Sequence, residues 1–237
     1  MRRRAESAVL NGSLFRVKRA ARQFLREQRW AAHAARLGAL LGKEYELFMT
    51  SPARLLLARH GRTALNAEGR LRGLADPPLD EVGVREAEGL ADALAPARFF
   101  VVLSSPLVRA VTTAQHIALA AGVPHRIDER LNDRDYGPWT GHLKADVVEE
   151  WGSVDAAPGV ESSEAVLSRV LPVLQELWTS SSSAVIVTHD AIIRPVIDHL
   201  DRGRQLSVPT ASWCVMVAGT SGWEVVDVDQ VAPRRER

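Results

Sequence analysis

Residues 54–61 read Arg54-Leu55-Leu56-Leu57-Ala58-Arg59-His60-Gly61. A short apolar run that stops at a charged residue and a glycine predicts a buried strand. Similar runs lie at 99–103 and 184–188, with segments of helical periodicity at 80–94, 106–121, 162–178 and 191–200. Two more strands are predicted at 213–217 and 223–228, and Pro172 predicts a kink or break in its helix. Continuous apolar strands alternating with helices indicate an α/β fold: a three-layer sandwich with a mostly parallel central sheet and helices on both faces.

Composition limits the class of protein. Of the 237 residues, 46% are hydrophobic, which is enough for a packed core and argues against global disorder. Cys214 is the single cysteine, so no intrachain disulfide can form, and this fits a reducing compartment. We see no apolar run of the ~18–20 residues that a membrane span needs, and no apolar core of a secretory signal. We therefore expect a cytoplasmic protein.

The charge is divided unevenly along the chain. Residues 1–43 hold eleven Lys or Arg and two Glu, a net of +9, whereas the rest holds 19 basic and 27 acidic residues, a net of −8. Apolar residues at helical spacing also run through this segment, so we predict a basic helical extension over 1–52 and a second domain over 53–237. Packing on its own domain or on a second copy, docking to a membrane or protein, and organellar import are open alternatives for residues 1–50.

Polar side chains follow three of the predicted strands. Arg59 and His60 end the first, Arg109 lies in the first helical turn after the second, and His189 follows the third. Ligand sites of open α/β sheets form at the carboxyl ends of the strands, so these four side chains should converge. Two guanidiniums and two imidazoles in one crevice favour a dianionic phosphate, because the arginine fork matches phosphate oxygens.

Four ordered motifs strengthen this interpretation. They are Arg59-His60-Gly61 with Asn66 and Gly69-Arg70; Ser104-Ser105-Pro106-Leu107-Val108-Arg109-Ala110; Leu131-Asn132-Asp133-Arg134-Asp135-Tyr136-Gly137; and Val187-Thr188-His189 with Arg194. Together they resemble the histidine phosphatase superfamily, which includes the cofactor-dependent phosphoglycerate mutases, over roughly residues 54–229.

The resemblance implies a role for each residue. His60 would be the nucleophile that accepts the phosphoryl group, while Arg59, Arg109 and His189 would bind the phosphoryl oxygens and stabilise their charge. Gly61 and Asn66 would help to bind substrate. Asp133 would be the general acid and then the base for water, with Asp135 as the alternative. Such an enzyme is a histidine acid phosphatase-type phosphomonoesterase that needs no cofactor and no metal.

The sequence departs from the family pattern at four positions. Asp133 stands where Glu is usual, so its reach is shorter by one methylene, and its pKa must rise from ~3.9 for it to act as an acid. Arg72 and Arg62 replace residues that are commonly uncharged or acidic; they are predicted either to add positive charge for substrate binding or to be solvated surface residues. Asp190 follows His189 where Gly is common, and it is predicted either to orient His189 or to point away.

The resemblance favours a phosphatase over a mutase. The resembling mutases carry a long insertion between the second arginine motif and the acid loop, whereas only 24 positions separate Arg109 from Asp133 here, which leaves little chain to enclose an intermediate. Phosphoglycerate mutase-type transfer is the first alternative, and a regulatory module that binds phosphate esters with little turnover is the second. The expected partner is a small phosphorylated substrate, nucleic acid is not expected, and a homodimer is left open.

Overall fold

The computed structural model describes residues 51–232 and contains one six-stranded sheet in this part of the chain. The strands are β1 (Arg54–Arg59), β2 (Val101–Ser104), β3 (His125–Ile127), β4 (Ala184–Thr188), β5 (Trp213–Ala218) and β6 (Trp223–Gln230). Their order is β3-β2-β4-β1-β5-β6. The first four strands pair in parallel, β5 is antiparallel to β1, and β6 is antiparallel to β5. The predicted α/β fold with a mostly parallel sheet is confirmed.

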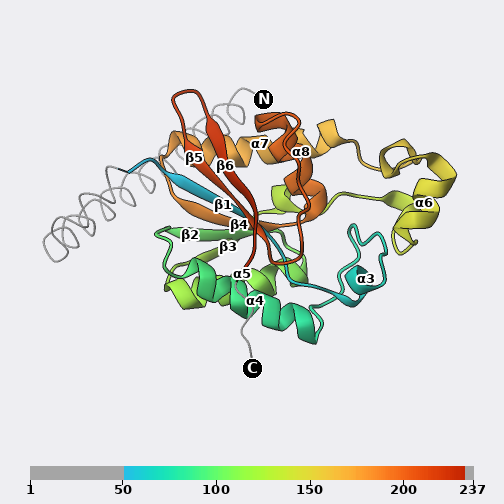
Figure 1. Ribbon diagram of the computed structural model, residues 1–237, viewed down its shortest axis with the longest axis horizontal. Coiled ribbons are helices and arrows are strands. Elements are labelled where there is room, and N and C mark those ends of the chain that lie inside the picture. The colour runs from blue at the N-terminus through green and yellow to red at the C-terminus, as the bar shows by residue number, and fades with distance from the viewer. Residues whose placement is uncertain (1–50, 233–237) are drawn as a thin grey trace, which may run out of the picture. The chain divides into compact units, whose positions relative to one another are not determined.

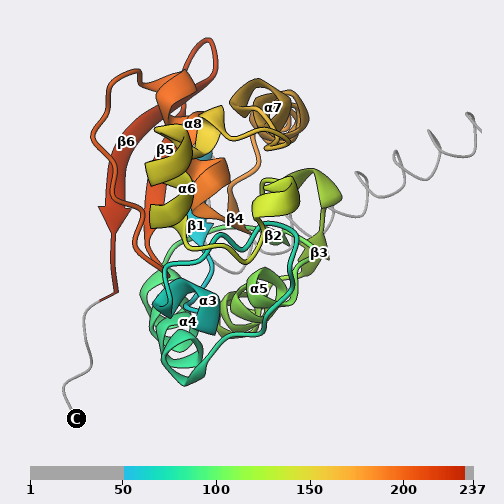
Figure 2. The ribbon, with the colours of Figure 1, turned by 90° about the vertical axis from the view of Figure 1, so that its right-hand side faces the viewer.

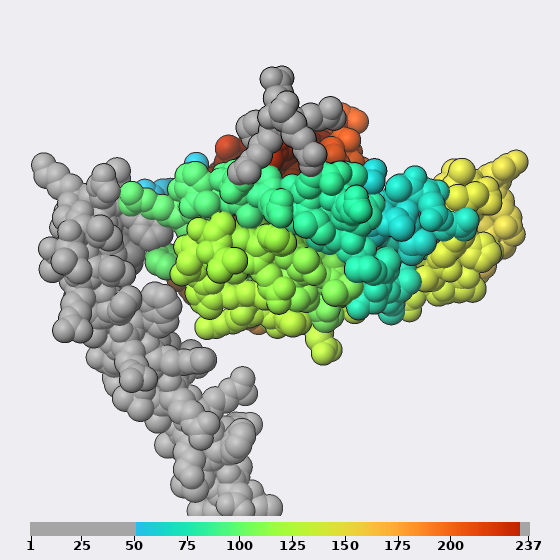
Figure 3. All heavy atoms as spheres, turned by 90° about the horizontal axis from the view of Figure 1, so that it is seen from below, coloured from blue at the N-terminus to red at the C-terminus, as the bar shows by residue number. Residues whose placement is uncertain are grey.

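Helices cover both faces of the sheet. The larger ones are α4 (Glu81–Leu94), α5 (Val108–Ala121), α7 (Ser163–Thr179) and α8 (Asp190–Leu200). Figure 1 shows α4 and α5 on one side of the sheet and α7 and α8 on the other. Figure 3 shows α4 and α5 in green as one continuous outer surface. None of the helices within residues 51–232 is long and apolar enough to cross a membrane.

Alternating side chains of the strands build two separate cores. Leu55, Leu57 and Ile186 pack with α7 and α8, whereas Leu56 and Val187 point to the opposite face and pack with α4 and α5. Every residue of β4 is buried, as expected for a central strand covered on both faces. This pleat explains why the strands read as continuous apolar runs.

The predicted element boundaries need four corrections. Strand β2 begins at Val101, two residues later than expected, and α5 begins at Val108 because Leu107, in an extended conformation, is its N-cap. Helix α7 continues through Pro172 without a break, because buried residues on both sides of it hold the helix on the core. Strand β3 escaped prediction because only three residues form it and two of them are exposed.

Smaller elements lie at the carboxyl edge of the parallel strands. They are α3 (Ala64–Ala67), α6 (Lys144–Trp151) and short 3-10 turns at Glu129–Leu131, Gly137–Trp139 and Val154–Ala156. Figure 2 views the molecule from the side on which α3 and α6 lie. The predicted extension over 1–52 falls almost wholly outside the described residues, and its helical structure stays a prediction.

Candidate active site

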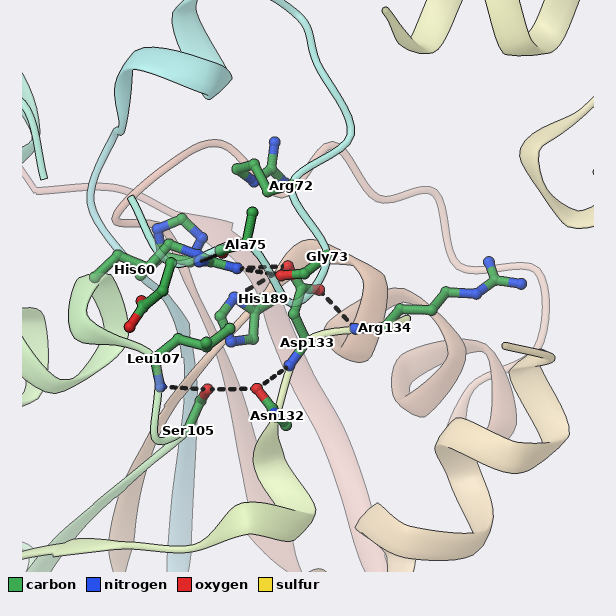
Figure 4. Close-up of polar contacts among 12 residues, drawn as sticks. His60, Arg72, Gly73, Ala75, Ser105, Leu107, Asn132, Asp133, Arg134 and His189 are labelled. Atoms are coloured by element: carbon green, nitrogen blue, oxygen red, sulfur yellow. Dashed lines mark hydrogen bonds and ion pairs between the residues drawn. The ribbon is translucent and has the colours of Figure 1, made fainter. Parts of the chain in front are cut away.

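The four strand-end side chains named above lie in one place. His60 follows β1, and its backbone N–H donates to the Thr188 carbonyl (3.0 Å), which brings it beside the end of β4. His189 is the N-cap of α8, and its ring centroid lies 5.0 Å from that of His60. Figure 4 shows His60, His189 and Asp133 converging, with Arg72 near them. Sheet topology thus assembles residues that are more than 120 positions apart.

His60 is held as one tautomer. Its Nδ1 lies 2.6 Å from the Gly61 carbonyl oxygen, which can only accept, so Nδ1 carries the proton and Nε2 keeps its lone pair. The ring is fully buried. Burial, followed by the positive charges of Arg109 and Arg59, holds the pKa of His60 well below its ordinary 6.5. A neutral imidazole with a free Nε2 is the form that a nucleophile requires.

Arg109 anchors the other side of the site. It is fully buried, and it donates from Nη1 to the Ala75 carbonyl (2.7 Å) and from Nη2 to the Gly73 carbonyl (2.9 Å) and to Asp133 Oδ2 (2.8 Å). These contacts fix the planar guanidinium in one orientation. Its Nε has no partner.

Asp133 lies inside the cluster and Asp135 lies outside it. Asp133 Oδ2 is 3.4 Å from His189 Nδ1, without hydrogen-bond geometry, and Oδ1 accepts from the Arg134 N–H (2.8 Å). Burial raises the pKa of Asp133 above 3.8, although Arg109 and Arg72 act to lower it. Asp135 is exposed, and its carboxylate accepts from the Gly137 N–H. The geometry therefore favours Asp133 as the carboxyl that acts on a bound ester.

Arg59, Arg72 and Asp190 form a second charged group at the same edge. Asp190 Oδ1 accepts from Arg72 Nη2 at 2.9 Å and lies 3.8 Å from Arg59 Nη2. Burial acts to raise the pKa of Asp190, but Arg59 and Arg72 outweigh it and the pKa is lowered, so the carboxylate is ionised. Asp190 therefore neither orients His189 by a hydrogen bond nor points into solvent. It offsets the charge of Arg72, which is buried rather than solvated.

Three other predicted substrate-binding residues are engaged elsewhere. Arg62 Nε donates to Asp80 Oδ2 (2.9 Å), and Asn66 Oδ1 accepts from the N–H and hydroxyl of Thr63 in the capping box of α3. The Gly61 N–H donates to Thr113 Oγ1 (3.1 Å). Their contacts with substrate stay predictions.

Unsatisfied buried nitrogens gather at this site. Within residues 51–232, the buried side-chain polar atoms without a hydrogen-bond partner are His60 Nε2, both ring nitrogens of His189, and the Nε atoms of Arg59, Arg72 and Arg109. Leaving buried polar groups unpaired is costly, so their concentration indicates a place for a ligand rich in acceptors. Among the described residues, no group of three or more His, Cys, Asp or Glu is arranged to hold a metal ion.

Comparisons with known proteins agree with this geometry. The family description "Histidine phosphatase superfamily (branch 1)" matches residues 55–230. The chain belongs to the histidine phosphatase superfamily. This assignment confirms the resemblance drawn from the four motifs.

Both phosphatases and mutases occur among similar members of the superfamily. A glucosyl-3-phosphoglycerate phosphatase of Mycolicibacterium vanbaalenii is 33% identical over 189 residues, covering 72% of this chain and 82% of the relative. A 2,3-bisphosphoglycerate-dependent phosphoglycerate mutase of Cytophaga hutchinsonii is 31% identical, covering 62% and 77%. The solved mycobacterial glucosyl-3-phosphoglycerate phosphatase with VO3 has a TM-score of 0.66 at 27% identity, covering 75% of this chain and 98% of the other. Together, family and relatives support a phosphatase enzyme.

One arginine and one glutamate of the site carry no sequence motif. Arg169 in α7 and Glu161 before it bind the backbone of the loop that carries Asp133. Neither follows a strand, and a single arginine on an amphipathic helix is typical of a solvated face, so the sequence pattern gave no signal for Arg169.

Proposed function

We propose that this protein is a metal-independent phosphomonoesterase that hydrolyses a small phosphorylated metabolite through a phosphohistidine on His60. The observation that carries the proposal is the free, unprotonated Nε2 of His60 among five other unpaired buried nitrogens. An incoming phosphate monoester supplies both an electrophilic phosphorus for Nε2 and anionic oxygens for the surrounding donors.

In the first step, His60 Nε2 attacks phosphorus and the bond from phosphorus to the leaving oxygen breaks. Arg59, Arg109 and His189 stabilise charge on the phosphoryl oxygens, which is most of what phosphoryl transfer requires. Asp133 transfers its proton to the leaving oxygen, and the alcohol departs. The raised pKa of Asp133 supports this role, because the carboxyl keeps its proton at a higher pH than an exposed aspartate does.

In the second step, ionised Asp133 takes a proton from water, whose oxygen attacks the phosphorus on His60. The bond from Nε2 to phosphorus breaks, inorganic phosphate leaves, and His60 returns to its neutral tautomer. Nδ1 keeps its proton throughout because the Gly61 carbonyl holds it.

Space for a leaving group lies beside the acid. A cleft of about 560 Å³ is lined by Asp133 but by no other residue of the phosphate site, and its lining includes Leu74, Val160, Arg169 and the acidic residues Glu129, Asp135 and Glu161. This volume suits a small-molecule ligand. Glucosyl-3-phosphoglycerate, the substrate in the name of one relative, therefore belongs in the first panel of candidate esters.

The direct test is phosphate release from p-nitrophenyl phosphate with EDTA present. We expect turnover by the wild type, a loss of at least about 10³-fold in His60→Ala, and an acid-labile radiolabel on the wild type after brief incubation with a labelled ester. His199→Ala is the matched control, because His199 is an exposed histidine of α8. Full activity of His60→Ala would refute the mechanism.

The same assay separates the two alternatives. Phosphoglycerate mutase-type transfer would move the label to an acceptor phosphoglycerate instead of to inorganic phosphate. A binding module would retain phosphate esters in a His60-dependent way without releasing phosphate.

A further inference from the structure

The loop that carries Asp133 has little regular structure of its own. A single 3-10 turn, Glu129–Leu131, precedes Asp133, and the next turn begins at Gly137. A carboxyl group must be placed to within a fraction of an ångström to protonate a leaving oxygen. Something outside the loop must therefore fix its backbone.

Arg169 makes three of those contacts, and the Thr188 hydroxyl makes another by donating to the Leu131 carbonyl oxygen (2.9 Å). From α7 its Nη1 donates to the carbonyl oxygens of Arg130 and Asn132, both at 2.8 Å, and its Nη2 donates to the carbonyl oxygen of Asp133 at 3.0 Å. One guanidinium thus satisfies three backbone acceptors within four consecutive residues, including that of the acid itself.

Glu161 fixes the guanidinium in turn. Its two carboxylate oxygens accept from Arg169 Nε (3.0 Å) and Nη2 (3.2 Å), and one of them also accepts from the Asp135 N–H (3.1 Å). Burial acts to raise the pKa of Glu161, but the hydrogen bonds from Arg169 and the Asp135 N–H and the positive charges of Arg169 and Arg134 together lower it, so the pair is ionic. The two side chains therefore hold the loop on both sides of Asp133.

We propose that Arg169 is a positioning residue for Asp133: anchored by Glu161, it holds the loop 130–133 so that the Asp133 carboxyl faces the phosphate site. This inference rests on the proposed function. Its consequence is specific, because loss of Arg169 should weaken proton donation to the leaving group while leaving the phosphate-binding arginines and histidines in place.

The kinetic test compares two esters with different leaving groups in wild type, Arg169→Gln and Arg169→Lys. An aryl ester leaves without much help from an acid, whereas an alkyl ester such as glycerol phosphate needs it. For Arg169→Gln we expect kcat on the alkyl ester to fall by about 30–100-fold and on the aryl ester by less than about 5-fold. Inhibition by vanadate should change by less than about 3-fold, and Arg169→Lys should recover part of the loss.

Asp133→Asn separates positioning from general structural damage. With the acid removed, adding Arg169→Gln should cost less than about 3-fold on the alkyl ester, since no proton donor is left to position. Arg130→Gln is the matched control. It breaks the half-exposed pairs with Glu176 of α7 and with Asp128 but keeps the carbonyl oxygen that Arg169 binds, so we expect less than about 2-fold change.

Amide hydrogen exchange gives a readout that needs no turnover. We expect the Asp133 and Arg134 amides to exchange at least about tenfold faster in Arg169→Gln, with α4 unchanged. Equal losses on both esters, an undiminished effect in the Asp133→Asn background, or unchanged exchange at these amides would each overturn the inference. If the wild type released no phosphate at all, the proposed function would fail, and the exchange result would still decide whether Arg169 holds the loop.

Discussion

At the scale of single residues, environment rather than residue type sets the chemistry of the site. Two buried histidines and one buried aspartate are all shifted toward their neutral forms, His60 and His189 by a lowered pKa and Asp133 by a raised one. A neutral imidazole beside a carboxyl that keeps its proton to a higher pH than an exposed aspartate is the pair that the first step of the proposed mechanism needs. The shifts predict how activity depends on pH.

The kinetic prediction concerns Asp133. Activity should rise as the pH passes upward through the pKa of His60, well below 6.5, and fall as Asp133 loses its proton, so the rate profile should be bell-shaped. Asp133→Asn should lose about 10²-fold or more on an alkyl ester, and the alkaline fall on an aryl ester should disappear apart from the substrate's own ionisation. Rate profiles of both proteins on one ester check this, since substrate ionisation is common to both. An unchanged alkaline limb in Asp133→Asn would assign that limb to another group.

The same scale shows where sequence reasoning succeeded and where it could not. The ends of apolar strands predicted the convergence of Arg59, His60, Arg109 and His189, because parallel strands bring their carboxyl ends to one edge. The pairing of Arg72 with Asp190 could not be predicted from the sequence. The two residues are 118 positions apart, and each could equally be a solvated surface charge.

At the scale of elements, periodicity predicted the long helices and the buried strands, while local contacts decided the rest. Strand β3 and the turns between 128 and 160 have too few residues for a periodic pattern. The loop after β1 crosses the start of α4 closely: a Cβ on Gly83 would lie 1.9 Å from the Arg62 carbonyl oxygen, and one on Gly61 would lie 2.4 Å from that of Gly83. Two glycines therefore let α4 support the loop that holds His60.

This contact predicts opposite effects of one substitution in one helix. Gly83→Ala must push the loop 61–62 away, so we expect it to destabilise the protein by about 1–3 kcal/mol and to reduce kcat by moving the Gly61 carbonyl that fixes His60. Gly89→Ala meets nothing closer than 3.7 Å, and should stabilise by about 0.5–1 kcal/mol with activity unchanged. Urea unfolding and phosphate release measure both. If both variants had the same stability and the same kcat, α4 would accommodate the extra methyl group without displacing the loop that holds His60.

At the scale of the whole molecule, the fold gathers charged side chains and buried nitrogens without hydrogen-bond partners at one edge of an otherwise well-packed sheet. The order β3-β2-β4-β1-β5-β6 puts β1 and β4 at the centre, where both faces are covered and both histidines that follow them are sealed from solvent. The apolar runs implied that these strands are buried but did not give the order of strands in the sheet. Burying two imidazoles in this way has a cost that depends on pH.

The sign of that cost follows from linkage. In the unfolded chain a histidine binds its proton near pH ~6.5, whereas His60 and His189 in the folded protein stay neutral to well below that value. The stability that each contributes is therefore present above pH ~6.5 and is lost as the pH falls toward the folded pKa, by up to about 1.4 kcal/mol per pH unit for each histidine. Asp133 acts in the opposite direction because its pKa is raised. The dependence of the unfolding free energy on pH is therefore the sum of the histidine and aspartate contributions.

A single substitution measures the contribution of His60 to this pH dependence of stability. His60→Gln keeps a similar volume and removes one titrating group, so the free energy of unfolding of the wild type should fall relative to that of the variant by about 1 kcal/mol per pH unit below pH ~6.5. Denaturant unfolding between pH 7.5 and 5 in phosphate-free buffer measures the difference, since bound phosphate would stabilise the two proteins unequally. Parallel stability curves for wild type and His60→Gln would show that the pKa of His60 is the same in the folded and unfolded states, and the lowered pKa of His60 would then be wrong.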